Sequence, residues 1–121
     1  MIKTEGLTHV HLVVRDVHRS LAFYQAVFGM ETHFWDGERM VFIGTPGQRD
    51  SITLNQSDDV QRAGAAGGVD HIGFRLLDKT QLDEAVAAVM EAGGRVIERG
   101  EHAPGHPFAY VADPDGYVIE L

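Results

Sequence analysis

The sequence predicts an α+β fold built from two similar βαβββ modules, and an internal repeat is the main reason. The stretch THVHLVVRD, residues 8–16, alternates like a strand, and DHIGFRLLD, residues 70–78, repeats its pattern. In each stretch a histidine, His9 or His71, stands seven residues before an aspartate. A helical pattern follows each stretch, and three short strand candidates follow each helix, so the two halves have the same element order.

The first module contains a predicted helix over residues 17–28, with a boundary signal at either end. Apolar residues recur near a 3.6-residue period in VHRSLAFYQAVF. Asp16 can cap the start of this helix, and Gly29 can stop it. We expect three strands to follow, METHFW (30–35), ERMVFIG (38–44) and SITLN (51–55), with a turn at Asp36-Gly37.

The second module shows the same order with different local signals. Thr80, with Asp83 three residues later, resembles a capping box and predicts the start of a helix that Gly93-Gly94 ends. One apolar stripe defines the buried face of this helix: Leu82, Val86, Val89 and Met90. We expect three strands after it, RVIERG (95–100), PFAYVA (107–112) and YVIEL (117–121), with the turn DPDG (113–116) before the last.

The two modules are expected to form one domain, because 121 residues suffice for a single compact core. Module one spans residues 1–56 and module two spans residues 69–121. Residues 57–68, SDDVQRAGAAGG, are rich in small residues and are interpreted as a linker.

The composition excludes several classes of function. Ten basic and eighteen acidic residues give a net charge of −8, which argues against nucleic acid and against an anionic membrane surface as partners. The absence of cysteine excludes disulfides, Cys-zinc sites and thiol nucleophiles. No apolar run reaches bilayer length and the N-terminus lacks the apolar core of a signal peptide, so we expect a cytoplasmic protein.

The repeat also brings four positions into correspondence. The segments ITL and IEL, centred on Thr53 and Glu120, match each other as His9 matches His71. A single histidine on a strand is more often structural than functional, but here the repeat regenerates it and the last strand adds a carboxylate. Two histidines and one carboxylate favour a metal site. The alternative is a pair of core histidines with a solvent-exposed Glu120.

Three segments together resemble the vicinal oxygen chelate superfamily, which includes glyoxalases, fosfomycin-resistance proteins, bleomycin-resistance proteins and type I extradiol dioxygenases. These segments are LTHVHLVVRDVHRSLAFYQAVFGM, VDHIGFRLLD and AYVADPDGYVIEL. The resemblance covers essentially the whole chain and implies that the two βαβββ modules form a curved mixed-sheet half-barrel around a divalent metal. It implies His9, His71 and Glu120 as the ligands, and it implies a homodimer.

The fourth of the corresponding positions, Thr53, distinguishes the reactions that this resemblance allows. Glyoxalase-type lyases fill it with a further side-chain ligand, commonly Glu, whereas Thr53 stands there in this chain. Thr53 is a poor metal ligand, so we assign it to substrate binding. Two histidines and a carboxylate leave coordination positions open, which suits non-haem Fe(II). The same set serves Mn(II) in fosfomycin-resistance thiol transferases, whose serine loop has no counterpart in GEHAPGHPF.

The C-terminal part resembles the segment of extradiol dioxygenases that runs Gly-x-His, an apolar residue, Tyr-x-x-Asp-Pro-x-Gly and the Glu ligand. Here it reads Gly100-Glu101-His102, Ala109, then YVADPDG from Tyr110, and Glu120. The resemblance implies that His102 and Tyr110 hydrogen-bond substrate and stabilise developing charge. Ala109 stands where a larger residue is usual, and a further histidine upstream of the second ligand is missing. Alternatively, His102 is a histidine of a loop and Tyr110 is an aromatic residue of the core, and neither contacts a substrate.

His11 marks one difference between the two modules, because its counterpart in the repeat is Gly73. It lies two residues from His9 on the same strand face. An imidazole titrates near neutrality, so His11 can act as general base or acid. Alternatively it hydrogen-bonds a backbone group or supports Glu120.

Arg75 marks a second difference, since Val13 is its counterpart. It shares a strand face with His71, and its guanidinium can bind an anionic group of a substrate. The alternative is a salt bridge at the end of the strand.

These observations predict a metal-dependent enzyme acting on a small molecule with adjacent oxygens. The first interpretation is an extradiol-type, Fe(II)-dependent dioxygenase of a catechol-like substrate. The second is a lyase or isomerase of the glyoxalase type, with His11 as base and Zn(II), Ni(II) or Mn(II). The third is a non-catalytic drug-binding protein of the bleomycin-resistance type, although such proteins need no metal ligands.

Overall fold

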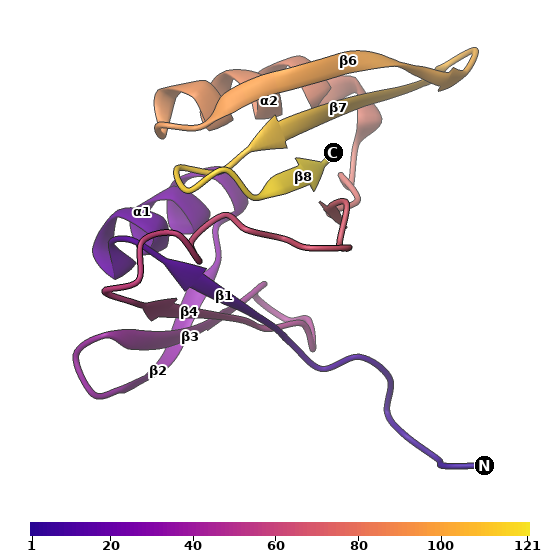
Figure 1. Cartoon of the computed structure of the whole chain (residues 1–121). Helices are drawn as coiled ribbons and strands as arrows, with labels where there is room; N and C mark the ends of the chain where they lie inside the picture. The colour runs from indigo at the N-terminus through magenta and orange to yellow at the C-terminus, as the bar shows by residue number, and fades with distance from the viewer.

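The chain forms two four-stranded sheets, one from each half of the sequence, in a computed structural model that describes residues 1–121 (Figure 1). The first sheet has the order β1-β4-β3-β2 and consists of β1 (Val10–Val14), β2 (Glu31–Asp36), β3 (Met40–Gly44) and β4 (Ile52–Gln56). The second has the order β5-β8-β7-β6 and consists of β5 (Ile72–Gly73), β6 (Arg95–Ala103), β7 (His106–Ala112) and β8 (Val118–Glu120).

Both sheets have the same topology, which confirms the predicted α+β class and the βαβββ repeat. In each sheet the first strand of the module pairs in parallel with its last strand, β1 with β4 and β5 with β8. The other neighbours pair antiparallel. The two sheets stay open and do not close into a barrel.

The helix of the first module, α1 (Val17–Phe28), begins and ends where the sequence predicts. The Asp16 carboxylate accepts hydrogen bonds of 3.0 Å from the backbone N–H groups of His18 and Arg19. Gly29 ends the helix with φ of +62°, a conformation that glycine adopts without steric penalty. Local signals therefore suffice to define this helix.

The helix of the second module, α2 (Leu82–Glu91), begins differently from the prediction. Asp78 caps the turn that precedes the helix: its carboxylate accepts from the Thr80 backbone N–H at 2.9 Å and from the Thr80 hydroxyl at 2.7 Å. Gln81, at the start of α2 itself, makes no side-chain capping hydrogen bond. The predicted capping box with Asp83 is wrong because the chain first makes a single 3₁₀ turn, η1 (Lys79–Gln81).

The predicted apolar stripe of α2 is correct for three of its four residues. Leu82, Val86 and Val89 are buried, whereas Met90 is 60 % exposed. Met90 lies one position after Val89 and therefore about 100° further round the helix, outside the face that packs on the sheet.

Several strands differ from their predicted bounds, and three of the differences affect predicted site residues or their neighbours. β1 begins at Val10, so His9 precedes it, and β5 has only two residues in place of the expected nine-residue stretch. β5 is short because it pairs in parallel with β8, which is itself only three residues long. β6 extends to Ala103 because its hairpin with β7 continues past the predicted end, which places His102 on a strand.

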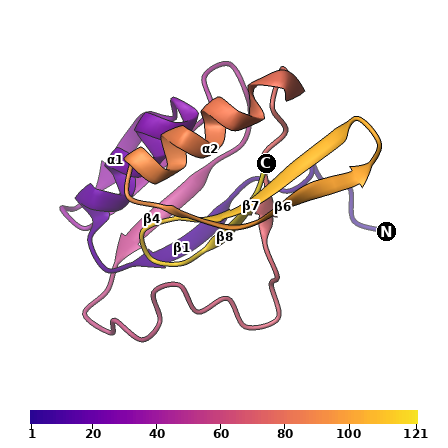
Figure 2. The ribbon, with the colours of Figure 1, turned by 90° about the horizontal axis from the view of Figure 1, so that it is seen from above.

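The two helices lie side by side and cover the same side of the two sheets (Figure 2). α1 packs on β4, α2 packs on β7, and the helices contact each other. The core lies between the helices and the sheets, and its largest fully buried apolar side chains are Phe23, Tyr24, Ile43, Leu54 and Ile119. Neither helix has the length and apolar character needed to cross a membrane.

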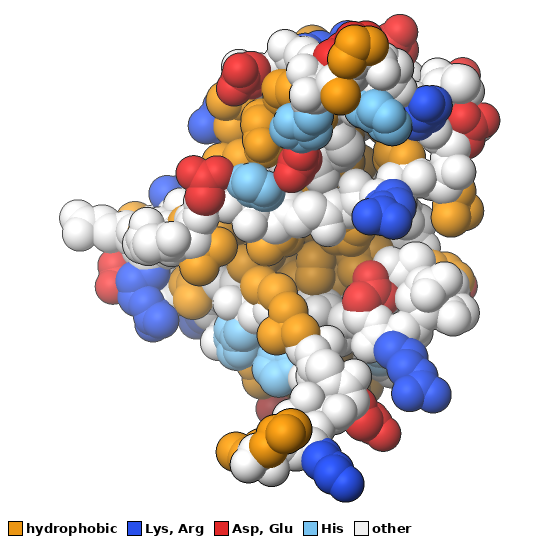
Figure 3. Space-filling view, turned by 90° about the vertical axis from the view of Figure 1, so that its right-hand side faces the viewer, with side chains coloured by type: hydrophobic (Ala, Val, Ile, Leu, Met, Phe, Trp, Pro, Cys, Tyr) orange, Lys and Arg blue, Asp and Glu red, His pale blue; other side chains and the backbone are white.

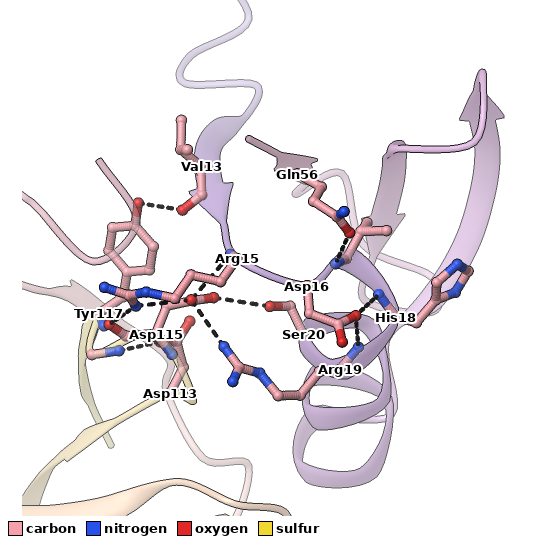
Figure 4. A network of polar contacts seen from close by, with 12 residues as sticks. Val13, Arg15, Asp16, His18, Arg19, Ser20, Gln56, Asp113, Asp115 and Tyr117 are labelled. Carbon is pink, nitrogen blue, oxygen red and sulfur yellow. Dashed lines mark hydrogen bonds and ion pairs between the residues drawn. The ribbon is translucent and has the colours of Figure 1, made fainter. Parts of the chain in front are cut away.

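A buried carboxylate, Asp115, joins the two modules (Figure 4). It lies in the turn between β7 and β8 and accepts hydrogen bonds from the Arg15 backbone N–H at 3.1 Å and the Ser20 hydroxyl at 3.1 Å. The guanidinium groups of Arg15 and Arg19 reach the same carboxylate at 3.1 and 3.0 Å. The turn of module two is thereby fixed to the start of α1 in module one.

Two further contacts strengthen this junction. The Asp113 carboxylate accepts from the Tyr24 hydroxyl at 2.9 Å and from the backbone N–H groups of the turn. The Tyr117 hydroxyl donates to the Val13 carbonyl at 2.7 Å. Burial raises the pKa of Asp113, and the hydrogen bond from Tyr24 partly offsets that shift.

Candidate metal centre

The second module brings two of the predicted site residues, His71 and His102, together around the carboxylate of a third, Glu120. His71 Nε2 lies 2.9 Å from one oxygen of Glu120, and His102 Nε2 lies 2.7 Å from the other. Glu120 belongs to β8, His71 directly precedes β5, and His102 lies near the end of β6. Residues separated by up to 49 positions therefore meet because their strands share one sheet.

Strand register also places Tyr110 in this group. Tyr110 of β7 pairs with Glu120 of β8, so both side chains project from the same face of the sheet. The rings of Tyr110 and His71 are 5.0 Å apart in an edge-on arrangement. His102 is held in turn by stacking on Phe108, with ring centroids 4.2 Å apart.

Asp70, which the sequence analysis did not single out, orients His71. Its carboxylate lies 2.7 Å from His71 Nδ1, while the opposite nitrogen, Nε2, faces Glu120. A carboxylate bonded to one ring nitrogen of a histidine is the usual support for metal binding through the other. The donor set of Glu120 and an oriented His71 therefore fits a divalent metal. The only sequence signal for this role is the adjacency of Asp70 to His71.

The pKa shifts in this cluster favour a protonated His71, an ionised Glu120 and a neutral Tyr110. The hydrogen bond that the His71 ring donates to the Asp70 carboxylate raises the pKa of His71, and the charge of Glu120 adds to the shift. The hydrogen bond from His102 lowers the pKa of Glu120. Burial raises the pKa of Tyr110, and the charge of Glu120 raises it further, so the phenol keeps its proton at neutral pH and can donate a hydrogen bond.

Within one chain, His9 of the first module does not belong to the cluster around Glu120. His9 is exposed, precedes β1, and has its nearest polar partner in the Thr8 hydroxyl, at 2.9 Å. No three His, Asp or Glu side chains of the chain surround a common point in the arrangement that a metal ion needs. On the side shown in Figure 3, histidines form two separate groups, one in the upper and one in the lower half of the molecule.

His11, unlike His9, lines a cavity together with residues of the second module. Leu12 and Val14 face the core, so strand alternation turns His11 to the opposite face of β1. His11 and His71 both line a cavity of about 370 Å³ between the edges of the two sheets. An imidazole of module one therefore opens onto the same cavity as a predicted ligand of module two.

Thr53 shares the sheet face of His11, since the two residues are partners in the register of β1 and β4. It is only 1 % exposed, and its hydroxyl has no hydrogen-bond partner. A buried unpaired hydroxyl costs about 1–3 kcal/mol. The position is therefore polar and unsatisfied in the single chain.

Arg75 follows β5 and is exposed, and its guanidinium makes neither a salt bridge nor a hydrogen bond. The alternative expectation of a salt bridge at the end of the strand is therefore not met. Arg75 lines a cavity of about 610 Å³ together with His102 and Glu120.

The family model for the Glyoxalase/Bleomycin resistance protein/Dioxygenase superfamily matches residues 6–121. The chain belongs to this superfamily. The expected resemblance to vicinal oxygen chelate proteins is thus confirmed over nearly the whole chain. Members of this superfamily act on small molecules and typically use a divalent metal.

Relatives within the superfamily have different activities. Lactoylglutathione lyases of two Neisseria meningitidis strains are 33% identical over 124 residues, covering 95% of this chain and 88% of theirs. Catechol-2,3-dioxygenase of Bacillus subtilis is 32% identical over 119 residues, covering 94% of this chain but 41% of that enzyme. The superfamily is therefore established, and the specific reaction is not decided by these likenesses.

Solved structures of the superfamily confirm the fold. A variant of the genomically encoded fosfomycin resistance protein of Listeria monocytogenes has a TM-score of 0.79 and 24% identity, covering 98% of this chain and 90% of that one. That protein was solved with Mn(II) and 1S,2S-dihydroxypropylphosphonic acid. A glyoxalase-related enzyme of Fulvimarina pelagi has a TM-score of 0.77 and 20% identity, covering 97% of this chain and 86% of that one.

Proposed function

We propose that the chain is a divalent-metal-dependent enzyme acting on a small molecule with two adjacent oxygens, and that its leading reaction is extradiol-type dioxygenation of a catechol-like compound. The observation that carries this choice is the position of His102 and Tyr110. Both lie beside Glu120 and His71, where a substrate bound to the same metal would meet them. The match to a catechol dioxygenase supports the same choice.

In this proposal His71 and Glu120 hold the metal, and His9 is the third ligand, contributed by a second copy of the chain in a homodimer. Asp70 orients His71 for this role. Three features of module one support a shared site: His9 is exposed, Phe34 is 54 % exposed although it is apolar, and the Thr53 hydroxyl is unpaired.

When bound, Fe(II) would supply a centre that accepts both substrate oxygens and O₂. The side chains of the protein then have separate tasks. Tyr110, protonated at neutral pH, donates a hydrogen bond to a substrate oxygen. His102, 2.7 Å from Glu120, accepts a proton from a substrate hydroxyl. The same imidazole returns this proton to the product, and His11 of module one is the alternative residue for the role.

A glyoxalase-type lyase or isomerase is the second candidate, and the extent of the matches favours it. The lactoylglutathione lyases align over 88% of their length, whereas the dioxygenase aligns over 41% of its length. In this candidate His11 is the base that moves a proton on the substrate, since Thr53 stands where such lyases commonly carry a carboxylate.

Metal analysis and two assays separate these candidates. The protein is purified without chelators, its metal content is measured, and separate samples are reconstituted with Fe(II), Mn(II), Zn(II) or Ni(II). O₂ uptake with catechols in the Fe(II) sample alone would establish the dioxygenase. Formation of lactoylglutathione without O₂ would establish the lyase. Failure to retain any stoichiometric metal would overturn both and leave a drug-binding protein.

Mixing two inactive variants tests whether the site is shared. His9→Ala and His71→Ala are unfolded together and refolded as a mixture. A shared site restores about a quarter of wild-type activity, because half of the dimers are mixed and each mixed dimer keeps one intact site of its two. Sites built within one chain would stay inactive, since every chain then lacks one ligand.

A further inference from the structure

We propose that the cavity of about 610 Å³ beside Glu120 binds a carboxylate of the substrate, with Arg75 as its cationic contact. This inference deepens the proposed function and rests on it, because the carboxylate belongs to a molecule whose adjacent oxygens lie at Glu120 and His71. It assigns a substrate class, namely acids and not their neutral analogues.

The cavity is a direct extension of the candidate metal centre. It lies between the segment after β5, the 3₁₀ turn η1 and the hairpin of β6 and β7. His102 and Glu120 belong to its wall and also to the metal-centre cluster. One small molecule can therefore occupy both spaces.

Packing on the opposite face fixes the direction of Arg75. The ring of Phe74 stacks on Phe28 of α1 with centroids 4.1 Å apart, and the Phe74 N–H donates to the Glu120 carbonyl at 2.9 Å. Arg75 directly follows β5, and alternation continued from that strand turns its side chain away from Phe74, toward His102 and Glu120 with which it lines the cavity. Arg75 stands two residues beyond Gly73, the register partner of Glu120, which corresponds to about 7 Å along the strand.

The charges around the cavity leave Arg75 available for an anion. Glu120 is the one carboxylate side chain of the wall, and both of its oxygens are occupied by His71 and His102. The Lys79 ammonium donates to the Gly105 carbonyl at 2.8 Å, which holds the β6–β7 hairpin against η1. Lys79 keeps its charge, because this acceptor is neutral, but one of its N–H groups is already used. Arg75 makes no hydrogen bond or salt bridge, so we assign the carboxylate to its guanidinium.

The remaining wall suits a substrate with an apolar body. Leu82, Phe108 and Leu76 contribute apolar surface, and His106 adds an imidazole at the hairpin. A guanidinium binds a carboxylate through two parallel hydrogen bonds, and one such pair balances one charge. In a chain with a net charge of −8, a local cation is also what draws an anion to the site.

Two matched pairs of probes test this inference. The first pair, phenylacetate and phenylacetamide, is titrated into the metal-free protein by NMR, following the backbone signals around Arg75. The second pair, 3,4-dihydroxyphenylacetate and its amide, is titrated by calorimetry into the metal-loaded protein without O₂. Each titration is repeated with Arg75→Gln, with Arg75→Lys and with Arg49→Gln, which changes an exposed arginine of module one.

We expect each acid to bind at least tenfold more tightly than its amide, because a charge-assisted hydrogen bond is lost with the amide. Arg75→Gln should abolish this preference, Arg75→Lys should retain part of it, and Arg49→Gln should leave it unchanged. Equal binding of acid and amide to the wild-type protein, or a preference that survives Arg75→Gln, would overturn the inference. Failure of the proposed function has a different signature: phenylacetate remains preferred, but the catechol hydroxyls add no affinity when metal is present.

Discussion

Replacing Asp115 by alanine should destabilise the chain more than the loss of any surface carboxylate, because this side chain joins the two modules. It comes from the turn between β7 and β8, and its partners Arg15, Arg19 and Ser20 all lie in module one. The Asp115 and Ser20 side chains are fully buried at this junction, so water cannot replace a lost partner there without rearrangement.

The magnitude follows from the four hydrogen bonds that the Asp115 carboxylate accepts from side chains and backbone of module one. The Arg15 and Arg19 side chains are 40 and 45 % exposed, so their guanidinium groups regain water and their ion pairs contribute little. The Arg15 backbone N–H and the Ser20 hydroxyl lose an acceptor in place, at about 1–3 kcal/mol each. We therefore expect Asp115→Ala to lower the free energy of unfolding by about 2–6 kcal/mol.

Urea unfolding followed by circular dichroism measures this change, with Asp83→Ala as the matched control. Asp83 is an exposed carboxylate paired with Arg99, so its removal should change the free energy of unfolding by less than about 0.5 kcal/mol. Asp115→Asn keeps an acceptor and should lose about half as much as Asp115→Ala. A loss below about 1 kcal/mol in Asp115→Ala, at an unchanged slope with urea, would refute the reasoning.

Three further expectations concern single side chains. Asp16→Ala removes the cap of α1 and should lower the free energy of unfolding by about 1 kcal/mol in the same urea assay. Tyr24→Phe removes the hydroxyl bonded to buried Asp113 and should lower it by about 1–2 kcal/mol, a result that an unchanged urea midpoint would contradict. The pKa of His71 is raised in the folded chain, so its contribution to stability is complete below the ordinary value of 6.5 and is lost as pH rises through the folded pKa. Asp70→Asn should lower the pKa of His71 in an NMR titration of the metal-free protein and move this loss of stability to lower pH; an unmoved pKa would exclude the role assigned to Asp70.

Local signals in the sequence were enough to predict the repeat and the first helix. The cap at Asp16 and the stop at Gly29 act on neighbouring backbone groups, so they can be recognised without knowledge of the fold. At the second helix two adjacent signals compete, and the Thr80 hydroxyl bonds to Asp78 instead of capping the helix itself. The sequence contains both signals and does not show which of them the backbone uses.

The junction between the modules could not be predicted, because its partners are far apart in the sequence. Asp115 stands 100 residues from Arg15 and 95 from Ser20. The turn DPDG was recognisable as a turn, but its two carboxylates are also typical of a solvent-exposed loop. Only the packing of the turn against α1 makes them buried acceptors.

Part of the candidate site could also be predicted from the sequence, and part could not. The repeat predicted His71 and Glu120, which the structure brings within 2.9 Å, and the C-terminal motif predicted Tyr110 and His102, which lie beside them. The role of His9 as the third ligand stays a prediction, since His9 lies outside this cluster within one chain and would have to come from a second copy. Contacts between copies leave no mark on the pattern of a single sequence.

The differences between the repeats indicate how the site gains its specificity. Equivalent strands keep the fold, but His11 in module one corresponds to Gly73 in module two, and Val13 corresponds to Arg75. In module two the missing side chain of Gly73 leaves free the surface next to Glu120, its partner in β8. Arg75 then stands at the far end of that surface, with its orientation fixed by Phe74 on the opposite face. Both of these differences therefore lie at positions that line the cavities, which is where a duplicated module can acquire a new substrate without disturbing its core.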